Sequence, residues 1–337
     1  MPLPHATIMR TPAPQTVDPR PALRQGASVA TVRATTVALV QSEPVFADLS
    51  ASLDKALAAI EDAATQGARL IVFGESWLAG YPFWVDAPRA SVWDDPEVKA
   101  AYAQLRAQSP TIDGPEVGRL RALAKARGVA VTMGMHERVD SGPGNGTLYN
   151  ALVTIDSSGA VAVHHRKLVP THGERLVWGP GDAHGLHAAD TVAGRVGGLI
   201  CWEHWMPLAR QAMHDSGEQL HVAQWPTVHD KHALVSRHYA LEGRCFVLAV
   251  GSLLRWSALP SALRPKGVDL QAFVVRGGSC IAAPDGSWVT EPVYEAEKTI
   301  LAELDLTSID RESMALDVSG HYSRPDVLQL RVVRDRR

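Results

Sequence analysis

The stretch RVGGLICWEHWMPLARQAMHDSGEQLHVAQWP (195–226) decides the fold class. It opens with an apolar run, RVGGLIC (195–201), which predicts a buried strand. A helix is predicted over 207–217, because Pro207 falls in the first turn, where its fixed φ is already helical. A second apolar run, LHVAQWP (220–226), predicts another strand. Strand, helix and strand in succession indicate an α/β domain.

The same alternation continues along most of the chain. Further strands are predicted at 35–41, 68–75, 129–138, 148–156, 160–168, 245–254, 279–284 and 299–306. Further helices are predicted at 49–67, 96–108, 115–127 and 232–244, with an aromatic-rich loop over 76–95. The sequence shows no linker after residue 31 and no internal repeat, so we expect one domain over 32–330 and a short C-terminal tail over 331–337.

Residues 1–31 differ in composition from the rest of the chain. They are rich in Pro, Ala, Thr and Arg and show no apolar periodicity. They also lack the apolar core of a secretory signal. We expect a disordered N-terminal tail here; an upstream start codon or a transit peptide are the alternatives.

The bulk composition is that of an ordinary globular protein. The chain has 337 residues, of which 46% are hydrophobic and 20% charged, with a formal net charge of -3. Without a basic stripe, nucleic acid is not an expected partner, and no apolar run has the length of a membrane helix. The three cysteines are too few for a disulfide scaffold and suit a reducing cytoplasm.

Three reactive side chains stand at the ends of predicted strands. Glu75 follows LIVFG, Lys167 follows AVAVHHR, and Cys201 follows RVGGLI. Chemistry in α/β folds tends to lie at the carboxyl ends of strands. If the three converge, the carboxylate can act as general base toward the thiol, and the ammonium can stabilise developing negative charge.

Each of these residues also has a purely structural interpretation. A single strand cysteine is more often a buried small hydrophobe than a nucleophile, and we interpret Cys245 and Cys280 in that way. Lys167 could lie at a strand edge, and Glu75 could cap the segment that follows it. The residues alone leave this choice open, because their convergence depends on the fold.

Three ordered segments carry a family resemblance. They are IVFGESWLAGYPFW (71–84), HRKLVPTHGERLVWGPGD (165–182) and GRVGGLICWEHWMPLAR (194–210). With them the chain resembles the nitrilase superfamily over about residues 33–330, and CWEH is the form found in its nitrilase branch. The resemblance implies an α/β fold, a four-layer α-β-β-α sandwich, and a Glu-Lys-Cys triad.

The resemblance also assigns roles to individual residues. Cys201 matches the nucleophile, Glu75 the general base and Lys167 the charge-stabilising lysine. Glu174 matches a second glutamate beside the lysine; its structural alternative is a loop carboxylate paired with Arg175. The backbone amide of Trp202 is implied as an oxyanion donor. The chemistry implied needs no cofactor and no metal.

The chain departs from the family pattern at two places. Gly74 stands where proline commonly precedes the first glutamate, a change expected to alter backbone stiffness but not chemistry. The chain also stops soon after GHYSRPDV, without the longer extension linked to filaments, so a homodimer or a larger even-numbered homo-oligomer is expected instead.

Aromatic and histidine residues near these segments have two interpretations. The aromatic residues either line the substrate pocket or fill the core, and for the pocket, together with His204, we select Trp77, Tyr81, Trp202 and Trp205. The histidines between 164 and 187 have spacings that could suggest zinc. However, no acidic or cysteine partner follows at regular spacing, so we interpret them as hydrogen-bonding residues.

The expected function is that of a nitrilase. It would hydrolyse an organic nitrile, of aromatic or arylaliphatic type, to the carboxylic acid and ammonia through a thioimidate and a thioester on Cys201. The alternatives are a cyanide hydratase or dihydratase, an amidase acting through the same acyl-enzyme, and a non-catalytic scaffold. The substrate partner is a small molecule in each enzymatic case.

Overall fold

The computed structural model describes residues 33–142 and 144–335. The tail expected over 1–31 and the last two residues of the C-terminal tail lie outside these described residues. One domain over 32–330 stays a prediction. No helix among the described residues combines the length and the apolarity needed to cross a membrane.

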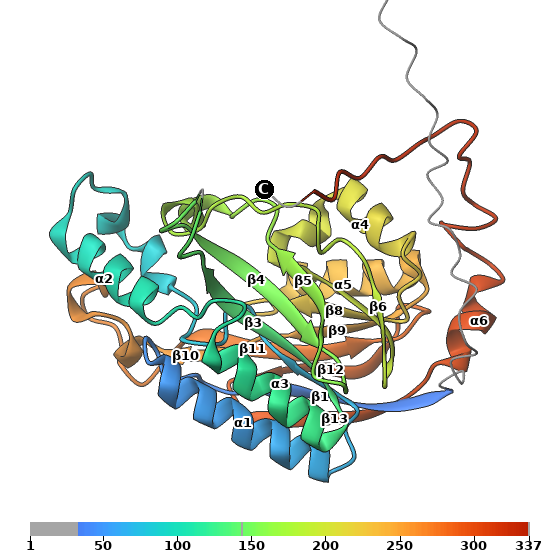
Figure 1. Cartoon of the computed structure of the whole chain (residues 1–337), viewed down its shortest axis with the longest axis horizontal. Helices are drawn as coiled ribbons and strands as arrows, with labels where there is room; N and C mark the ends of the chain where they lie inside the picture. Colours follow the sequence, from blue (N-terminus) through green and yellow to red (C-terminus); the bar gives the residue numbers. More distant parts are fainter. Residues whose placement is uncertain (1–32, 143, 336–337) are drawn as a thin grey trace, which may run out of the picture. The chain divides into compact units, whose positions relative to one another are not determined.

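Two sheets form the centre of the fold (Figure 1). The first has the order β13-β1-β2-β3-β4-β5. Its strands are β1 Ala34–Gln41, β2 Leu70–Phe73, β3 Ala130–Arg138, β4 Leu148–Ile155, β5 Val161–Arg166 and β13 Lys298–Asp305. Strands β1, β2 and β3 run parallel, whereas β13, β4 and β5 join them in antiparallel fashion.

The second sheet has the order β10-β11-β9-β8-β7-β6, with β12 paired to β11. Its strands are β6 Ala189–Thr191, β7 Gly194–Ile200, β8 Leu220–Gln224, β9 Phe246–Val250, β10 Leu253–Arg255, β11 Phe273–Ala282 and β12 Trp288–Tyr294. Strands β7, β8 and β9 are parallel. The reactive residues Glu75, Lys167 and Cys201 were expected at the carboxyl ends of strands in these two sheets.

Helices cover the outer face of each sheet. Helices α1 (Leu49–Thr65) and α3 (Pro115–Arg127) pack together and against the first sheet, and α5 (Asp230–Gly243) packs against β9 and β11 of the second. Helix α4 (Pro207–His214) follows β7, and α2 (Pro96–Ala107) and α6 (Thr307–Ser313) complete the set. The two sheets contact each other through β1, β2, β4, β7 and β9, so the expected four-layer α-β-β-α sandwich is confirmed.

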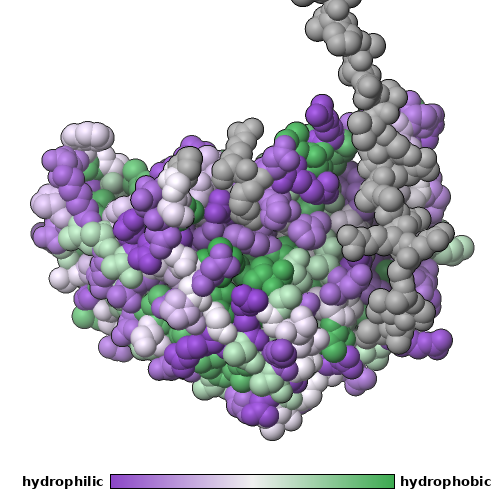
Figure 2. Space-filling view, viewed as in Figure 1, coloured by the Kyte–Doolittle hydropathy of each residue, from purple (hydrophilic) through white to green (hydrophobic). Residues whose placement is uncertain are grey.

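The alternation of side chains along β1 shows how the layers are held together. Val37 and Leu39 belong to the apolar cluster between the sheets, whereas Ala38 and Val40 belong to the cluster beneath α1 and α3. Successive side chains of a strand point to opposite faces, so a strand buried on both faces reads as a continuous apolar run. On the surface, hydrophilic residues dominate the face shown in Figure 2, with separate apolar areas between them.

The helix boundaries follow from local chemistry. Asp48 caps α1 by accepting a hydrogen bond from the Ala51 backbone N–H. Helix α3 begins with Pro115 and ends before Gly128, which has a left-handed φ of 64°. These ends agree with the sequence patterns to within one or two residues.

Two predicted strands were wrong in their extent. The strand predicted at 279–284 begins earlier, at Phe273. The apolar run 245–254 forms two strands, β9 and β10, which are interrupted at Gly251. A Cβ on Gly251 would lie 2.2 Å from the carbonyl oxygen of Gly277. The chain therefore turns here because two backbones approach closely, a tertiary contact that an apolar run does not reveal. Strands β6 and β12 and helix α6 were not predicted, and short 3-10 turns at Phe83–Asp86 and Pro88–Ser91 lie inside the expected loop.

Candidate active site

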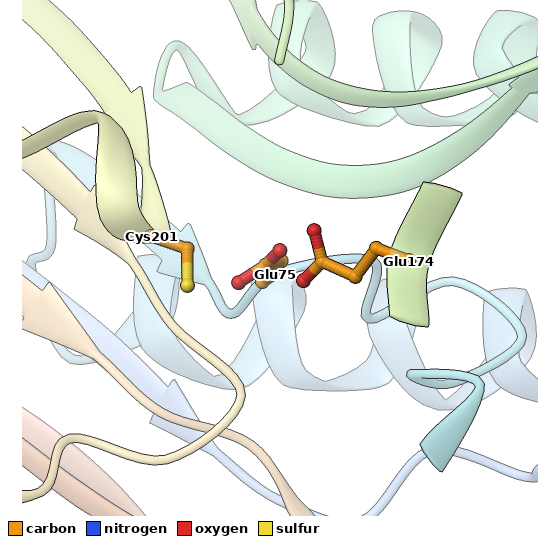
Figure 3. Close-up of side chains that lie close together, drawn as sticks. All are labelled: Glu75, Glu174 and Cys201. Atoms are coloured by element: carbon orange, nitrogen blue, oxygen red, sulfur yellow. The ribbon is translucent and has the colours of Figure 1, made fainter. Parts of the chain in front are cut away.

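Four segments that are distant in sequence bring their reactive side chains together. Glu75 follows β2, Lys167 follows β5, Glu174 lies in the 3-10 turn His172–Leu176, and Cys201 begins the 3-10 turn Cys201–Trp205 after β7. In Figure 3, Glu75 lies between Cys201 and Glu174, and the three side chains point toward one another. A ligand atom from each of these three lies within 4.8 Å of the others.

Lys167 is the cation shared by the two carboxylates. Its Nζ donates to Glu75 Oε1 at 2.8 Å and to Glu174 Oε2 at 2.7 Å. Asn150 Nδ2 also donates to Glu75 Oε1, at 2.7 Å, and the Tyr81 hydroxyl donates to Glu174 Oε1, at 2.8 Å. The ammonium therefore bridges the two carboxylates and compensates their negative charge.

Burial sets the electrostatics of the site. Removal from water raises the pKa of Glu75 to about 7, even though the Lys167 ammonium opposes this shift. Burial, followed by the nearby Glu75 carboxylate, raises the pKa of the Cys201 thiol well above its ordinary value. Burial alone would lower the pKa of Lys167, but Cys201, Glu75 and Glu174 in their ionised forms raise it. The site at rest therefore holds a thiol, an ammonium and a carboxylate that titrates near neutrality.

The nucleophile position has an uncommon backbone conformation. Cys201 has a φ of 54°, in the left-handed region that L residues rarely adopt, and its side chain is almost wholly buried. The backbone N–H of Trp202 forms a hydrogen bond that favours the thiolate and lowers the Cys201 pKa. Strained residues of this kind persist only where the surroundings hold them.

Glu203 is a site residue that the sequence interpretation missed. Its carboxylate accepts hydrogen bonds from the backbone N–H groups of Leu168 and Ile200, both at 2.7 Å, and faces His165 Nε2 at 2.9 Å. Leu168 follows Lys167, and Ile200 precedes Cys201. Glu203 therefore fixes the lysine segment against the cysteine segment. Its place in the CWEH motif was the available signal. Asn150, which bonds Glu75, offered none.

The residues expected to line the pocket divide into three groups. Tyr81 contacts the site through Glu174, and Trp202 and Trp205 are 45% and 39% exposed. Trp77 and His204 lie elsewhere than expected. Trp77 is buried in the cluster beneath α1 and α3, where its Nε1 donates to the Ser42 carbonyl.

His204 lies beneath the nucleophile rather than in a substrate pocket. It is fully buried, and both of its ring nitrogens face protein groups, Cys201 O at 2.7 Å and His221 Nε2 at 2.9 Å. The predictions that Trp77 and His204 contact substrate are therefore corrected. The other histidines expected to form hydrogen bonds include His164, which faces Glu137 Oε2.

Beside the nucleophile, Trp202 opens onto a surface cavity of about 620 Å³. This cavity combines aromatic and charged side chains, namely Trp202, His229, Asp230, Lys231, His232, Arg276 and Tyr294. The ring of Trp202 meets that of His232 edge-on at 6.2 Å. Aromatic surface is therefore exposed one residue away from the nucleophile.

Known proteins are similar to this chain in sequence and in fold. Residues 36–311 match the carbon-nitrogen hydrolase family. The chain is 39% identical to a protein named nitrilase 2 from an unknown prokaryotic organism, covering 90% of this chain and 93% of that protein. It is 38% identical to an aliphatic nitrilase of Sinorhizobium fredii, covering 87% and 94%, and 36% identical to an arylacetonitrilase of Hypocrea virens, covering 89% and 92%.

The fold is also found in solved structures. Nit3 of Saccharomyces cerevisiae, a member of branch 10 of the nitrilase superfamily, matches with a TM-score of 0.68 at 22% identity, covering 89% of this chain and 100% of that one. The family match spans most of the chain. The relatives named above are called nitrilases, and the alignments cover nearly their whole length. The chain therefore belongs to the carbon-nitrogen hydrolase family, in its nitrilase branch.

Proposed function

We propose that the protein hydrolyses an organic nitrile to a carboxylic acid and ammonia. The observation that carries this proposal is the convergence of Cys201, Glu75, Lys167 and Glu174 in one buried site. The names of the relatives agree with it, since they are nitrilases. In this proposal Cys201 is the nucleophile, Glu75 the general base and Lys167 the electrostatic stabiliser.

The first step is addition of sulfur to the nitrile carbon. Because the Cys201 pKa is high, the thiol transfers its proton to Glu75 as the sulfur attacks. A base with a pKa of about 7 is well matched to this transfer near neutral pH. The nitrile nitrogen gains the proton, and a thioimidate forms on Cys201. Lys167 stabilises the negative charge that develops on nitrogen.

The later steps use two water molecules. Glu75 removes a proton from the first water as its oxygen adds to the thioimidate carbon, and the nitrogen leaves as ammonia. The product of this step is a thioester on Cys201. The second water attacks the thioester, which releases the carboxylic acid and restores the thiol. Expulsion of the thiolate before ammonia leaves would instead give the amide.

We also propose a preference for aromatic or arylaliphatic nitriles. The support is the exposed aromatic surface of Trp202, which lines the cavity, and of Trp205, whose ring lies 6.3 Å from that of Trp202. Stacking and apolar burial favour an aromatic ring there. The relatives do not decide the matter, since one is named an aliphatic nitrilase and another an arylacetonitrilase.

The activity is tested by following ammonia, acid and amide from phenylacetonitrile, benzonitrile and a short aliphatic nitrile, with cyanide and matching amides in parallel. The Cys201→Ala protein should lose all turnover, whereas Cys280→Ala, a buried cysteine outside the site, should retain it. Cyanide disappearance must be followed directly, because its hydration to formamide frees no ammonia. Turnover of amides alone, or of cyanide alone, would overturn the proposal.

The preference is tested by the ratio of kcat/KM for phenylacetonitrile to that for the aliphatic nitrile. Trp202→Leu should lower this ratio about tenfold, the effect of losing one aromatic contact. Trp93→Leu is the matched control, because Trp93 is 94% exposed and lies in the loop after β2. An aliphatic nitrile that is preferred by the unmodified protein would contradict the aromatic preference.

The assembly and the location are proposed separately. We propose a homodimer or larger homo-oligomer in the cytoplasm. Exposed leucines on α4 and α5, namely Leu208, Leu234 and Leu241, support self-association, and the three free cysteines support a reducing compartment. Light scattering on the purified protein tests the first point; a monomer at micromolar concentration would contradict it.

A further inference from the structure

A buried chain of polar side chains runs from the nucleophile into the core behind it. His204 Nδ1 lies 2.7 Å from the carbonyl oxygen of Cys201. His204 Nε2 lies 2.9 Å from His221 Nε2, and His221 Nδ1 lies 2.8 Å from Glu218 Oε2. Both histidines are fully buried, and Glu218 is 5% exposed. None of these three touches the reacting atoms in the proposed mechanism.

The hydrogen bonds among His204, His221 and Glu218 fix the number of protons that these side chains hold. A backbone carbonyl only accepts, so His204 Nδ1 must carry a hydrogen. The two facing Nε2 atoms need one hydrogen between them, and the contact between His221 and Glu218 needs another. The three hydrogen bonds therefore require three hydrogens, but two neutral imidazoles supply only two. Together, His204, His221 and Glu218 must therefore hold one more proton than two neutral histidines and a carboxylate would.

The surroundings of Glu218 place this extra proton on a histidine. The other oxygen of Glu218 accepts a short hydrogen bond from the Tyr239 hydroxyl. Burial raises the pKa of Glu218, but His221 and His214 outweigh this effect and lower it to about 2. Glu218 is therefore a carboxylate. Of the two histidines, only His221 contacts this carboxylate, at 2.8 Å, so the geometry places the positive charge on His221. Burial and the neighbouring His221 lower the pKa of His204 well below its ordinary value.

The charges of the neighbouring elements agree with this assignment. The titratable and charged groups around His204, His221 and Glu218 come from α4, from α5 and from the residue before β9, namely Arg210, His214, His232, Tyr239, Glu242 and Cys245. Arg210 pairs with Glu242, which balances both charges. His214 competes for Glu218 but lies 3.7 Å away, beyond hydrogen-bond distance, and its Nε2 contacts Glu242. A proton on His214 would not complete the chain to Cys201.

We propose that His221 is a buried imidazolium, paired with Glu218, that positions the nucleophile by fixing the hydrogen bond from His204 to the Cys201 carbonyl. With His221 as donor, the single N–H of His204 is committed to Nδ1. If His221 were neutral, its N–H toward Glu218 would leave Nε2 as an acceptor, and His204 would have to satisfy two acceptors with one hydrogen. The imidazolium thus stabilises the left-handed Cys201 backbone.

The protonation is tested directly by neutron diffraction from a crystal of the whole protein exchanged into deuterated buffer near pD 7.5. We expect deuterium on both ring nitrogens of His221, on Nδ1 alone of His204, and on neither oxygen of Glu218. Deuterium on Glu218, or on only one nitrogen of His221, would overturn the assignment. This measurement does not depend on what the enzyme hydrolyses.

The positioning role is tested with paired variants at each histidine. His204→Asn keeps a donor close to the Nδ1 position, whereas His204→Ala removes it. His221→Gln keeps a neutral donor toward His204, whereas His221→Leu does not. We expect the Ala and Leu variants to lose about 100-fold in kcat with KM changed less than threefold, the scale of a slightly misplaced reacting group. The Asn and Gln variants should recover at least tenfold of that loss.

The kcat and KM measurements rest on the proposed function, because they need nitrile turnover. Alkylation of Cys201 by iodoacetamide does not need turnover, so it tests the positioning role independently. The alkylation rate should follow the same order among the variants, because it reports the thiol alone. If nitriles are not turned over but alkylation follows this order, positioning stands and the proposed function fails. Equal loss in all four variants, with unchanged melting temperatures, would overturn the positioning role.

Discussion

Glu203 accepts a hydrogen bond from the backbone N–H of Leu168 at 2.7 Å. The same carboxylate accepts one from Ile200, so a single buried side chain joins the segment that carries Lys167 to the segment that carries Cys201. Burial raises the Glu203 pKa, but His165 and these donors lower it below its ordinary value. All of its contacts are hydrogen-bond donors. Only a carboxylate presents two oxygens that can both accept from them.

Glu203→Gln should therefore be costly. The amide nitrogen of Gln must face a donor, so we expect a loss of about 3 kcal/mol in the free energy of unfolding together with a large fall in kcat. Urea unfolding measures the first effect. Glu303→Gln, on the exposed side of β13, is the matched control. Equal stability of the two variants would show that Glu203 does not hold the segments together.

Asn150 is expected to set the lower end of the pH range of the enzyme. Its Nδ2 donates to Glu75 and favours the ionised carboxylate, which lowers the Glu75 pKa against the effect of burial. Since the base must be ionised to act, activity should rise with pH through about 7. Asn150→Leu removes the donor, so the midpoint of this rise in kcat/KM should move to higher pH.

The pH profile of Asn145→Ala serves as the control for Asn150→Leu. Asn145 is exposed in the turn before β4 and makes no contact with Glu75, so its profile should match that of the unmodified protein. A midpoint for Asn150→Leu that stays in place or moves to lower pH would contradict the role given to Asn150.

Much of the site could be predicted because its chemistry is concentrated at strand ends. Their positions at strand ends made Glu75, Lys167 and Cys201 candidates, but the residues alone left the choice open, and the family resemblance assigned their roles. Asn150 could not be found in this way, because it belongs to the interior of β4 and meets Glu75 across 75 residues of sequence. The hydrogen-bond partners of His204 could not be predicted for the same reason, because they depend on how strands and helices pack together in the fold.

The errors also have physical causes. Trp77 stands two residues from Glu75, but a position next to a site residue does not say which face of the sheet a side chain takes. The break between β9 and β10 depends on the close approach of Gly251 to Gly277, which no local pattern encodes. Periodicity therefore predicted the alternation of strands and helices, whereas the four-layer arrangement was implied by the family resemblance. Periodicity failed where contacts distant in sequence determine the outcome.

Lys167 is predicted to exclude metal ions from the site. Its ammonium lies between Glu75 and Glu174, whose oxygens together with the Cys201 sulfur form a set of metal-ligand atoms within 4.8 Å. Lys167→Ala removes the cation and leaves two carboxylates and a thiol, a set that suits zinc. We expect this variant to bind about one Zn²⁺ per chain by calorimetry, and the unmodified protein to bind none there.

Two further proteins make the zinc experiment decisive. Lys55→Ala removes a surface lysine paired with Glu297 and should not gain zinc. Lys167→Ala combined with Cys201→Ala should bind zinc at least tenfold more weakly, because one ligand is lost. Zinc binding of equal affinity in the single and double variants would place the ion elsewhere and contradict the prediction.

Gly74 is predicted to be required by packing, although its replacement of proline was expected to matter only for backbone stiffness. A Cβ at this position would lie 2.3 Å from Ser252 Oγ. That hydroxyl has no hydrogen-bond partner within the described part of the chain. Gly74→Ala should therefore destabilise the protein by about 2 kcal/mol and, by shifting Glu75, lower kcat.

Removing the obstructing hydroxyl should reverse much of the Gly74→Ala effect. Ser252→Ala costs little alone, because its Oγ is unpartnered among the described residues, and the double variant should be more stable than the sum of the single effects by about 1 kcal/mol. Gly118→Ala, in α3 with nothing within 4 Å of the added Cβ, should instead stabilise slightly. Additive effects at Gly74 and Ser252 in urea unfolding would show that the two side chains do not compete for the same space.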